Sequence, residues 1–206
     1  MPLQNRVCPD GIIKSSRSRG TFMGNRGVLH NANKELKRQF KAKAWITCLL
    51  EFKGRQRELM SPNAYTELFF LDEVTAFAAG HRPCAECRRA RYNEFRDAWS
   101  DANSWEGDTV VRAPQLDEVL HAQRIDGDQK VLWRHSLANL PHGTMFRVGD
   151  DSYAVCDQKM VKWGFEGYSA AEREDLPETV DVLTPRSVVN VFNSGFRPVF
   201  HPSAIS

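Results

Sequence analysis

The chain has 206 residues, of which 41% are hydrophobic and 26% are charged. This composition is that of an ordinary globular protein with one large core or two small ones, and it excludes a disordered or collagen-like chain. No run of about 18 consecutive apolar residues occurs, so we expect no membrane-spanning helix and no membrane partner. The amino-terminal residues lack the apolar stretch of an export signal, which favours a cytoplasmic protein.

The formal net charge of +2 hides a gradient along the chain. Residues 1–60 carry 13 Lys and Arg against 4 Asp and Glu, whereas residues 101–206 carry 10 against 16. A basic end of this kind points to a polyanionic partner, nucleic acid first. The alternative is a basic surface that is merely solvated.

The first half of the chain predicts a basic arm followed by short strands. Residues 1–20 are rich in Pro, Gly, Ser and basic side chains and predict a flexible arm. Trp45–Phe52 is rich in β-branched and aromatic residues and predicts a strand with Cys48 in its middle. A turn at Lys53–Gly54 would return the chain through Arg55–Met60 as a hairpin, and Tyr65–Phe70 predicts a further strand.

Two helices are predicted next. Asp72 can cap a short helix over Glu73–Ala79, which Gly80 ends at a position that favours a left-handed residue. Pro83 then opens a second helix running from Cys84 to about Ala98. Its apolar face would consist of Tyr92, Phe95 and Trp99.

The carboxy-terminal part, 106–206, predicts one helix and a β-meander. The helix follows Pro114 and ends at Asp126–Asp128. Three short apolar runs separated by turn residues predict antiparallel strands at Met145–Val148, Tyr153–Cys156 and Met160–Trp163. We therefore predict an α+β protein with a basic arm over 1–20, a zinc-binding domain of short strands and helices over 21–105, and an α+β domain over 106–206.

A stretch of the sequence echoes itself at a distance of 115 residues. Phe77–Pro83 aligns with Phe192–Pro198, and the Phe, Gly, Arg and Pro coincide. Both copies predict a strand, a short helix, a glycine stop and Arg-Pro. Duplication and coincidence both explain this echo. The second copy has no cysteine and only His201 nearby, so its chemistry would differ.

The most specific motif is Pro83-Cys84-Ala85-Glu86-Cys87. Two thiols with this spacing can bind one ion, and zinc fits best, but a tetrahedral site needs further ligands from elsewhere in the chain. Cys48 is the first candidate and His30 the second, followed by Cys8 and His81. Five cysteines, an odd number, do not indicate a disulfide framework.

Other interpretations of the cysteine pair remain open. A redox couple would follow a βαβ pattern that is missing here. A nucleobase deaminase would need His-x-Glu or its Cys variant on a preceding helix, and Cys48–Glu51 has the wrong spacing for it. The two cysteines could also be buried residues without a ligand.

The stretch Glu73–Arg88 resembles the second half of the zinc-binding module of the Ada DNA-repair family, and the likeness extends over about residues 67–89. A short Ala-rich helix, a glycine, Arg-Pro and Cys-x-x-Cys-Arg follow in the same order. The resemblance implies that Cys84 and Cys87 are zinc ligands and that the module contacts DNA. The family's earlier cysteine pair, which includes its methyl acceptor, has no counterpart here beyond Cys48, so methyl transfer is not expected.

Arginines around the motif suit a nucleic-acid partner, because guanidinium groups bind phosphate. The candidates for contacts with DNA, or with RNA, are Arg26, Arg82, Arg88, Arg89 and Arg91. The chain thus predicts a zinc-stabilised nucleic-acid-binding protein of repair or regulatory type. A metal-dependent nuclease using His135, His142, Asp150 and Asp151 is the alternative, and the sequence leaves open whether the protein is an enzyme.

Overall fold

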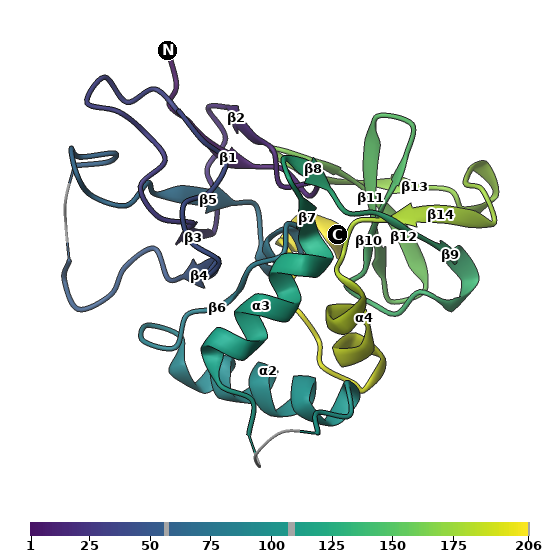
Figure 1. Ribbon diagram of the computed structural model, residues 1–206. Coiled ribbons are helices and arrows are strands. Elements are labelled where there is room, and N and C mark those ends of the chain that lie inside the picture. Colours follow the sequence, from purple (N-terminus) through teal and green to yellow (C-terminus); the bar gives the residue numbers. More distant parts are fainter. Residues whose placement is uncertain (56–57, 107–109, 206) are drawn as a thin grey trace.

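The computed structural model describes residues 1–55, 58–106 and 110–205. Within them the strands form two six-stranded sheets and a two-stranded ribbon, so the predicted α+β class is confirmed. The two large sheets lie on opposite sides of the molecule, and three helices gather at one end (Figure 1). The strand expected over Trp45–Phe52 is shorter and covers only Ile46–Cys48. The hairpin strand expected over Arg55–Met60 falls partly outside the described residues.

The first sheet has the strand order β2-β1-β5-β3-β4-β6. Two of its pairs, β1 with β5 and β4 with β6, are parallel, and the others are antiparallel. The strands are β1 Gln4–Val7, β2 Ile13–Ser15, β3 Phe22–Asn25, β4 Ile46–Cys48, β5 Leu68–Phe70 and β6 Arg82–Pro83.

The second sheet has the order β13-β12-β11-β10-β14-β9 and is antiparallel throughout. It contains the expected meander, because β10, β11 and β12 pair in sequence. Its strands are β9 Trp133–Ser136, β10 Met145–Val148, β11 Asp151–Cys156, β12 Lys159–Gly164, β13 Gly167–Ala171 and β14 Thr179–Val182. The small ribbon consists of β7 Ile125–Asp126 and β8 Gln129–Lys130.

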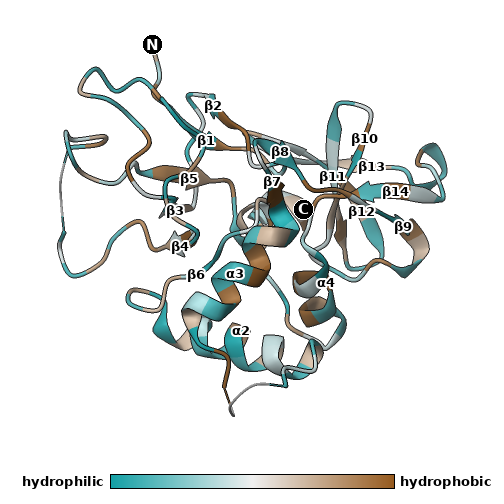
Figure 2. Cartoon of the chain, viewed as in Figure 1, coloured by the Kyte–Doolittle hydropathy of each residue, from teal (hydrophilic) through white to brown (hydrophobic). Residues whose placement is uncertain are grey.

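The helices are α1 Glu73–Ala78, α2 Arg89–Ala102, α3 Ala113–Arg124 and α4 Arg186–Asn193, with short 3-10 turns at Leu137–Asn139, Arg173–Asp175 and Pro202–Ala204. Helix α3 carries both hydrophobic and hydrophilic residues around its circumference (Figure 2). None of the described helices has the length and apolar character needed to cross a membrane.

Helix α1 lies at the centre of the molecule, and all six of its residues are buried. Ala76 packs in the core of the first sheet, whereas Val74 and Ala78 pack in that of the second. Phe77 enters the aromatic core between α2, α3 and α4. A helix that is covered on all sides in this way needs mostly apolar residues, and its two buried polar residues, Glu73 and Thr75, have hydrogen-bond partners.

The core crosses the predicted boundary at residue 105. Tyr92, Phe95 and Trp99 of α2 share one cluster with Leu116 of α3 and Val188 of α4. The parts 21–105 and 106–206 are therefore joined by a common core. The two parts differ in the charge of their residues, but they do not have separate hydrophobic cores.

Residues 1–20 do not form the predicted flexible arm. They supply β1 and β2, whose Val7 and Ile13 are 1% exposed and pack against β5. The strands are only four and three residues long, so their local pattern is weak. Pairing with a distant strand stabilises them, and composition alone does not report such pairing.

The two copies of the internal echo adopt the same local structure. In the first, β5 leads to α1 and Gly80 has φ 86°, and in the second, β14 leads to α4 and Gly195 has φ 101°. Asp72 caps α1 as expected, since its carboxylate accepts a hydrogen bond from Thr75 N at 2.8 Å. Both glycines occupy the left-handed region that ends a helix.

Gly80→Ala is expected to destabilise the protein by about 2 kcal/mol, because the new methyl group combines a strained backbone with a collision. A Cβ at this position would lie 2.5 Å from Cδ of the buried Arg124. Gly127→Ala is the matched control, since Gly127 also has a positive φ but nothing lies within 4 Å of its Cβ position. Urea unfolding of both variants checks this expectation, and equal losses would contradict it.

Candidate metal centre

Three cysteine sulfurs meet at the edge of the first sheet. The Sγ atoms of Cys48, Cys84 and Cys87 all lie within 4.8 Å of one another. Cys48 and Cys84 are buried, and Cys87 is half-buried. The structure therefore brings the Cys-x-x-Cys pair together with the third cysteine that the sequence favours.

The pairing of β4 with β6 places Cys84 beside Cys48. Thr47 is in register with Pro83 across this parallel pair. The next amide, Cys84 N, donates to Thr47 O at 2.9 Å. Cys48 comes directly after Thr47 in the sequence, and Cys84 comes directly after Pro83. Because Thr47 and Pro83 are paired, the two cysteines lie side by side at the ends of neighbouring strands.

A tight turn then carries the chain from Cys84 to Cys87. Glu86 N lies 3.4 Å from Cys84 Sγ and donates to it, and Arg88 N donates to Cys84 O. Helix α2 begins only at Arg89, so the predicted helix start at Cys84 is wrong. Pro83 does not open a helix here, because it pairs within the sheet, at an edge position where its missing N–H is tolerated.

The surroundings of the cluster favour one thiolate over the others. A hydrogen bond from Cys48 lowers the pKa of Cys84 to about 5. Burial opposes this shift, and the backbone amides of Cys87 and Glu86 add to it. The hydrogen bond to Cys84 and burial raise the pKa of Cys48. One negative charge is therefore stabilised in the cluster at neutral pH.

The donor set fits a metal ion that prefers sulfur. Around a tetrahedral zinc with Zn–S distances of about 2.3 Å, the sulfurs would be about 3.8 Å apart, which agrees with the observed grouping. Within the described residues, no fourth His, Cys, Asp or Glu joins the three cysteines in this group. The cluster can hold a metal ion through three protein ligands.

His30 does not join the cluster. Its Nδ1 lies 2.6 Å from Thr66 Oγ1 and its Nε2 lies 3.2 Å from Ser61 O, so both ring nitrogens are used in holding a loop. The two weaker candidates are also elsewhere. His81 accepts a hydrogen bond from Arg26, and burial raises the pKa of Cys8 to about 12, which leaves a protonated thiol.

Arg82 serves the fold and does not face a nucleic-acid partner. Its Nε and Nη2 donate to the two carboxylate oxygens of Asp117, both at 2.8 Å, and both side chains are buried. The pair joins α3 to β6, immediately before Pro83 and Cys84. It therefore positions one end of the cysteine turn.

Three more of the predicted DNA contacts are buried or paired inside the protein. Arg88 and Arg91 both bind the carboxylate of Glu73, which is 1% exposed. Arg26 is itself 1% exposed. Only Arg89 among the five candidate arginines is exposed. Sequence spacing alone does not reveal that a basic residue meets a distant carboxylate or carbonyl oxygen.

The residues considered for nuclease chemistry do not converge. His142 lies near Cys156 and Asp157 at one end of β11, whereas Asp151 begins that strand and pairs with Lys162. His135 is on β9, at the edge of the sheet. Glu51, the residue considered for deaminase chemistry, is exposed on the segment after β4.

Two basic residues that no sequence pattern singles out, Arg124 and Lys130, also come together in the fold. Both line a large pocket together with Arg26. Each has an ordinary sequence neighbourhood, at the end of α3 and in the β7–β8 ribbon. Folding brings them close to Arg26, although they lie about 100 residues after it in the sequence. No short sequence motif predicts a contact over that separation.

Comparison of the chain with protein-family models, with curated proteins and with solved structures finds no match.

Proposed function

We propose that this protein is a zinc-stabilised nucleic-acid-binding protein. The observation that carries the zinc assignment is the convergence of Cys48, Cys84 and Cys87. Thiolate ligands favour zinc over oxygen-seeking cations such as magnesium and calcium. Bound there, the ion would cross-link β4, the end of β6 and the start of α2, and would thereby stabilise the fold.

The basic surface of the first 60 residues supports the nucleic-acid assignment. Exposed cations in this part of the chain that form no ion pair within the described residues are Lys14, Arg17, Arg19, Arg38, Lys41 and Lys53. Their charge is available to phosphates, in contrast to that of Arg82 or Arg88. The resemblance of Glu73–Arg88 to the Ada zinc module agrees with DNA as the partner.

Fluorescence anisotropy with labelled duplex DNA, single-stranded DNA and RNA tests the proposal. We expect binding that weakens steeply with salt, because each neutralised phosphate releases counterions. The double variant Arg17→Gln and Arg19→Gln should reduce the magnitude of the slope of log K against log salt by about 2. These two arginines are exposed and follow β2.

The matched control removes two exposed cations from the acidic half, through Arg134→Gln and Lys159→Gln. This variant has the same change in net charge and should keep the salt slope of the unmodified protein. Absence of binding to all three nucleic acids at low salt would overturn the proposal, as would equal effects of the two double variants.

A further inference from the structure

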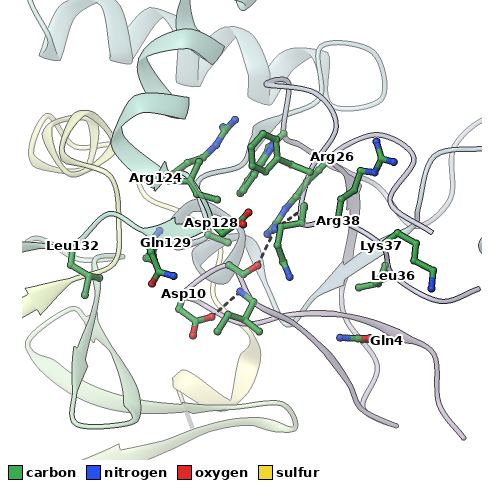
Figure 3. A pocket seen from close by; sticks show the side chains of 18 of the residues that line it. Gln4, Asp10, Arg26, Leu36, Lys37, Arg38, Arg124, Asp128, Gln129 and Leu132 are labelled. Atoms are coloured by element: carbon green, nitrogen blue, oxygen red, sulfur yellow. Dashed lines mark hydrogen bonds between the residues drawn. The ribbon is translucent and has the colours of Figure 1, made fainter. Parts of the chain in front are cut away.

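A pocket of about 980 Å³ lies between the first sheet, the end of α3 and the β7–β8 ribbon. Figure 3 shows side chains reaching it from separate stretches of chain, with Arg26 and Arg124 on the upper side of the view and Asp10 on the lower side. Its basic lining residues are Arg26, Lys37, Arg38, Arg124, Lys130 and Arg147. Its acidic lining residues are Asp10 and Asp128.

Arg26 is a buried guanidinium that forms no ion pair with a carboxylate of the described residues. Its Nε donates to His81 Nε2 at 3.2 Å and its Nη1 donates to Gly11 O at 2.9 Å. Its Nη2 is buried and has no hydrogen-bond partner within the described chain. Burial and the nearby charge of Arg124 lower the pKa of Arg26, because both disfavour the charged form of the guanidinium at this position.

Arg124 presents a second buried guanidinium beside the first. Its Nη1 and Nη2 donate to the carbonyl oxygens of Gly80 and Lys43. The guanidinium carbons of Arg124 and Arg26 lie 4.0 and 3.8 Å from the centre of the Trp45 ring. Neither arginine forms an ion pair with any described residue, so both rely on carbonyl oxygens, histidine nitrogens and the Trp45 ring.

Lys130 adds a third cation. Its Nζ donates to Ala78 O at 2.6 Å, and no described carboxylate pairs with it. Burial lowers the pKa of Lys130 to about 7, with Asp10 opposing the shift and Arg26 and Arg124 adding to it. The positive charges of Arg26 and Arg124 thus disfavour the protonated form of Lys130 across the same space.

Buried cations that lack counter-charges destabilise a fold unless an anion compensates them. Asp10 offsets part of this positive charge, but its Oδ1 accepts a hydrogen bond from Ile12 N in its own turn and it forms no ion pair with Arg26, Arg124 or Lys130. Of the six basic lining residues, Lys37 and Arg147 pair with Glu35 and Asp181, and the remaining four still outnumber the two acidic lining residues. A bound dianion would interact favourably with all three central cations.

We propose that this pocket binds the phosphate group of an organic phosphate, with Arg26, Arg124 and Lys130 at its inner wall and Arg38 at its rim. Guanidinium groups match phosphate oxygens in geometry, and several cations around one site suit a dianion better than a single carboxylate. The volume exceeds that of a phosphate group alone, which leaves room for an attached organic part. The proposal does not depend on zinc or on nucleic-acid binding.

Isothermal titration calorimetry with inorganic phosphate, pyrophosphate and adenosine monophosphate tests the site, with adenosine as the uncharged comparison. We expect binding of the phosphorylated compounds and none of adenosine. Oligonucleotides with a 5′-phosphate or a 5′-hydroxyl group distinguish a strand end from a free small molecule as the source of the phosphate. Absence of binding by every phosphate-bearing compound at millimolar concentration would overturn the proposal.

Two variants locate the site. Lys130→Gln and Arg38→Gln should each weaken phosphate binding by about tenfold, as expected for one lost charge-assisted hydrogen bond. Lys41→Gln is the control, because Lys41 is exposed on the same segment as Arg38 but does not line the pocket. Circular dichroism establishes that each variant is folded. Equal affinity in all three variants would place the anion elsewhere and would overturn the proposal.

The outcomes separate this proposal from nucleic-acid binding. A smaller salt slope for DNA in the Arg17 and Arg19 double variant, with phosphate binding unchanged, would identify the pocket as a separate site. Weaker phosphate binding in Lys130→Gln, with the salt slope for DNA unchanged, would likewise show that the pocket and the nucleic-acid surface are separate sites.

Discussion

From the proposed zinc site, Cys84→Ser is expected to abolish stoichiometric metal binding and to leave the protein largely unfolded. The Cys84 sulfur is central to the cluster, because it receives the hydrogen bond from Glu86 N and lies next to Cys48. A serine hydroxyl is a poor zinc ligand at neutral pH, and structural zinc sites contribute about 10 kcal/mol or more of binding free energy to folding. Elemental analysis and thermal unfolding of the purified variant measure both effects.

Cys8→Ser is the matched control for that experiment. Cys8 is also buried but lies outside the cluster, and its raised pKa keeps it a thiol. We expect it to retain all of the metal and to lose only about 1 kcal/mol of stability. Wild-type protein treated with a chelator should behave like Cys84→Ser. Wild-type protein that folds normally without stoichiometric metal would overturn the zinc assignment.

Glu73→Gln is expected to destabilise the protein by about 3 to 5 kcal/mol, because it leaves buried cations without their counter-charge. Glu73 accepts hydrogen bonds from Arg88, from Arg91 and, through Oε2, from Val199 N at 3.0 Å. It therefore ties α1 to the start of α2 and to the carboxy-terminal segment. Chemical unfolding in urea measures the loss.

Glu94→Gln provides the comparison. Glu94 also pairs with Arg91, but its side chain is 56% exposed, so its removal should cost no more than about 0.5 kcal/mol. Equal losses in the two variants would show that burial does not strengthen the Glu73 contacts.

The same substitution should change the dependence of stability on pH. Burial alone would raise the pKa of Glu73, but Arg91 and Arg88 outweigh it and hold the pKa below its usual value. The ionised carboxylate therefore stabilises the fold above the unfolded-state pKa of about 4.3, and this contribution falls as the pH drops through the folded-state pKa. The difference in stability between wild type and Glu73→Gln should shrink below about pH 4.

Local signals predicted several parts of the structure well. Asp72 and Gly80 bound α1 as expected, and the alternating runs after residue 144 form the meander. The Cys-x-x-Cys spacing, together with a cysteine in a nearby strand, predicted the three members of the cluster. In each case the signal lies within a few residues of the feature, because caps, turns and strand alternation are short-range effects.

Other parts depended on partners far along the chain. Arg82 meets Asp117 35 residues later, and Arg91 meets Glu73 18 residues earlier. From the sequence these arginines were expected to contact nucleic acid. In the structure they are largely buried and pair with carboxylates, so they stabilise the fold. The helix predicted to begin at Cys84 begins at Arg89 instead, because Pro83 is held in the sheet by β4.

The amino-acid sequence by itself determined the α+β class, the central helix with its cap and stop, and the sulfur donors of the candidate metal centre. Only the tertiary structure decided that residues 1–20 join a sheet, that both halves share one core, and that Arg26, Arg124 and Lys130 surround one pocket. The physical reason is range. Backbone propensities and ligand spacings act within a few residues, whereas burial, ion pairing and mutual repulsion of cations arise between groups that only folding brings together.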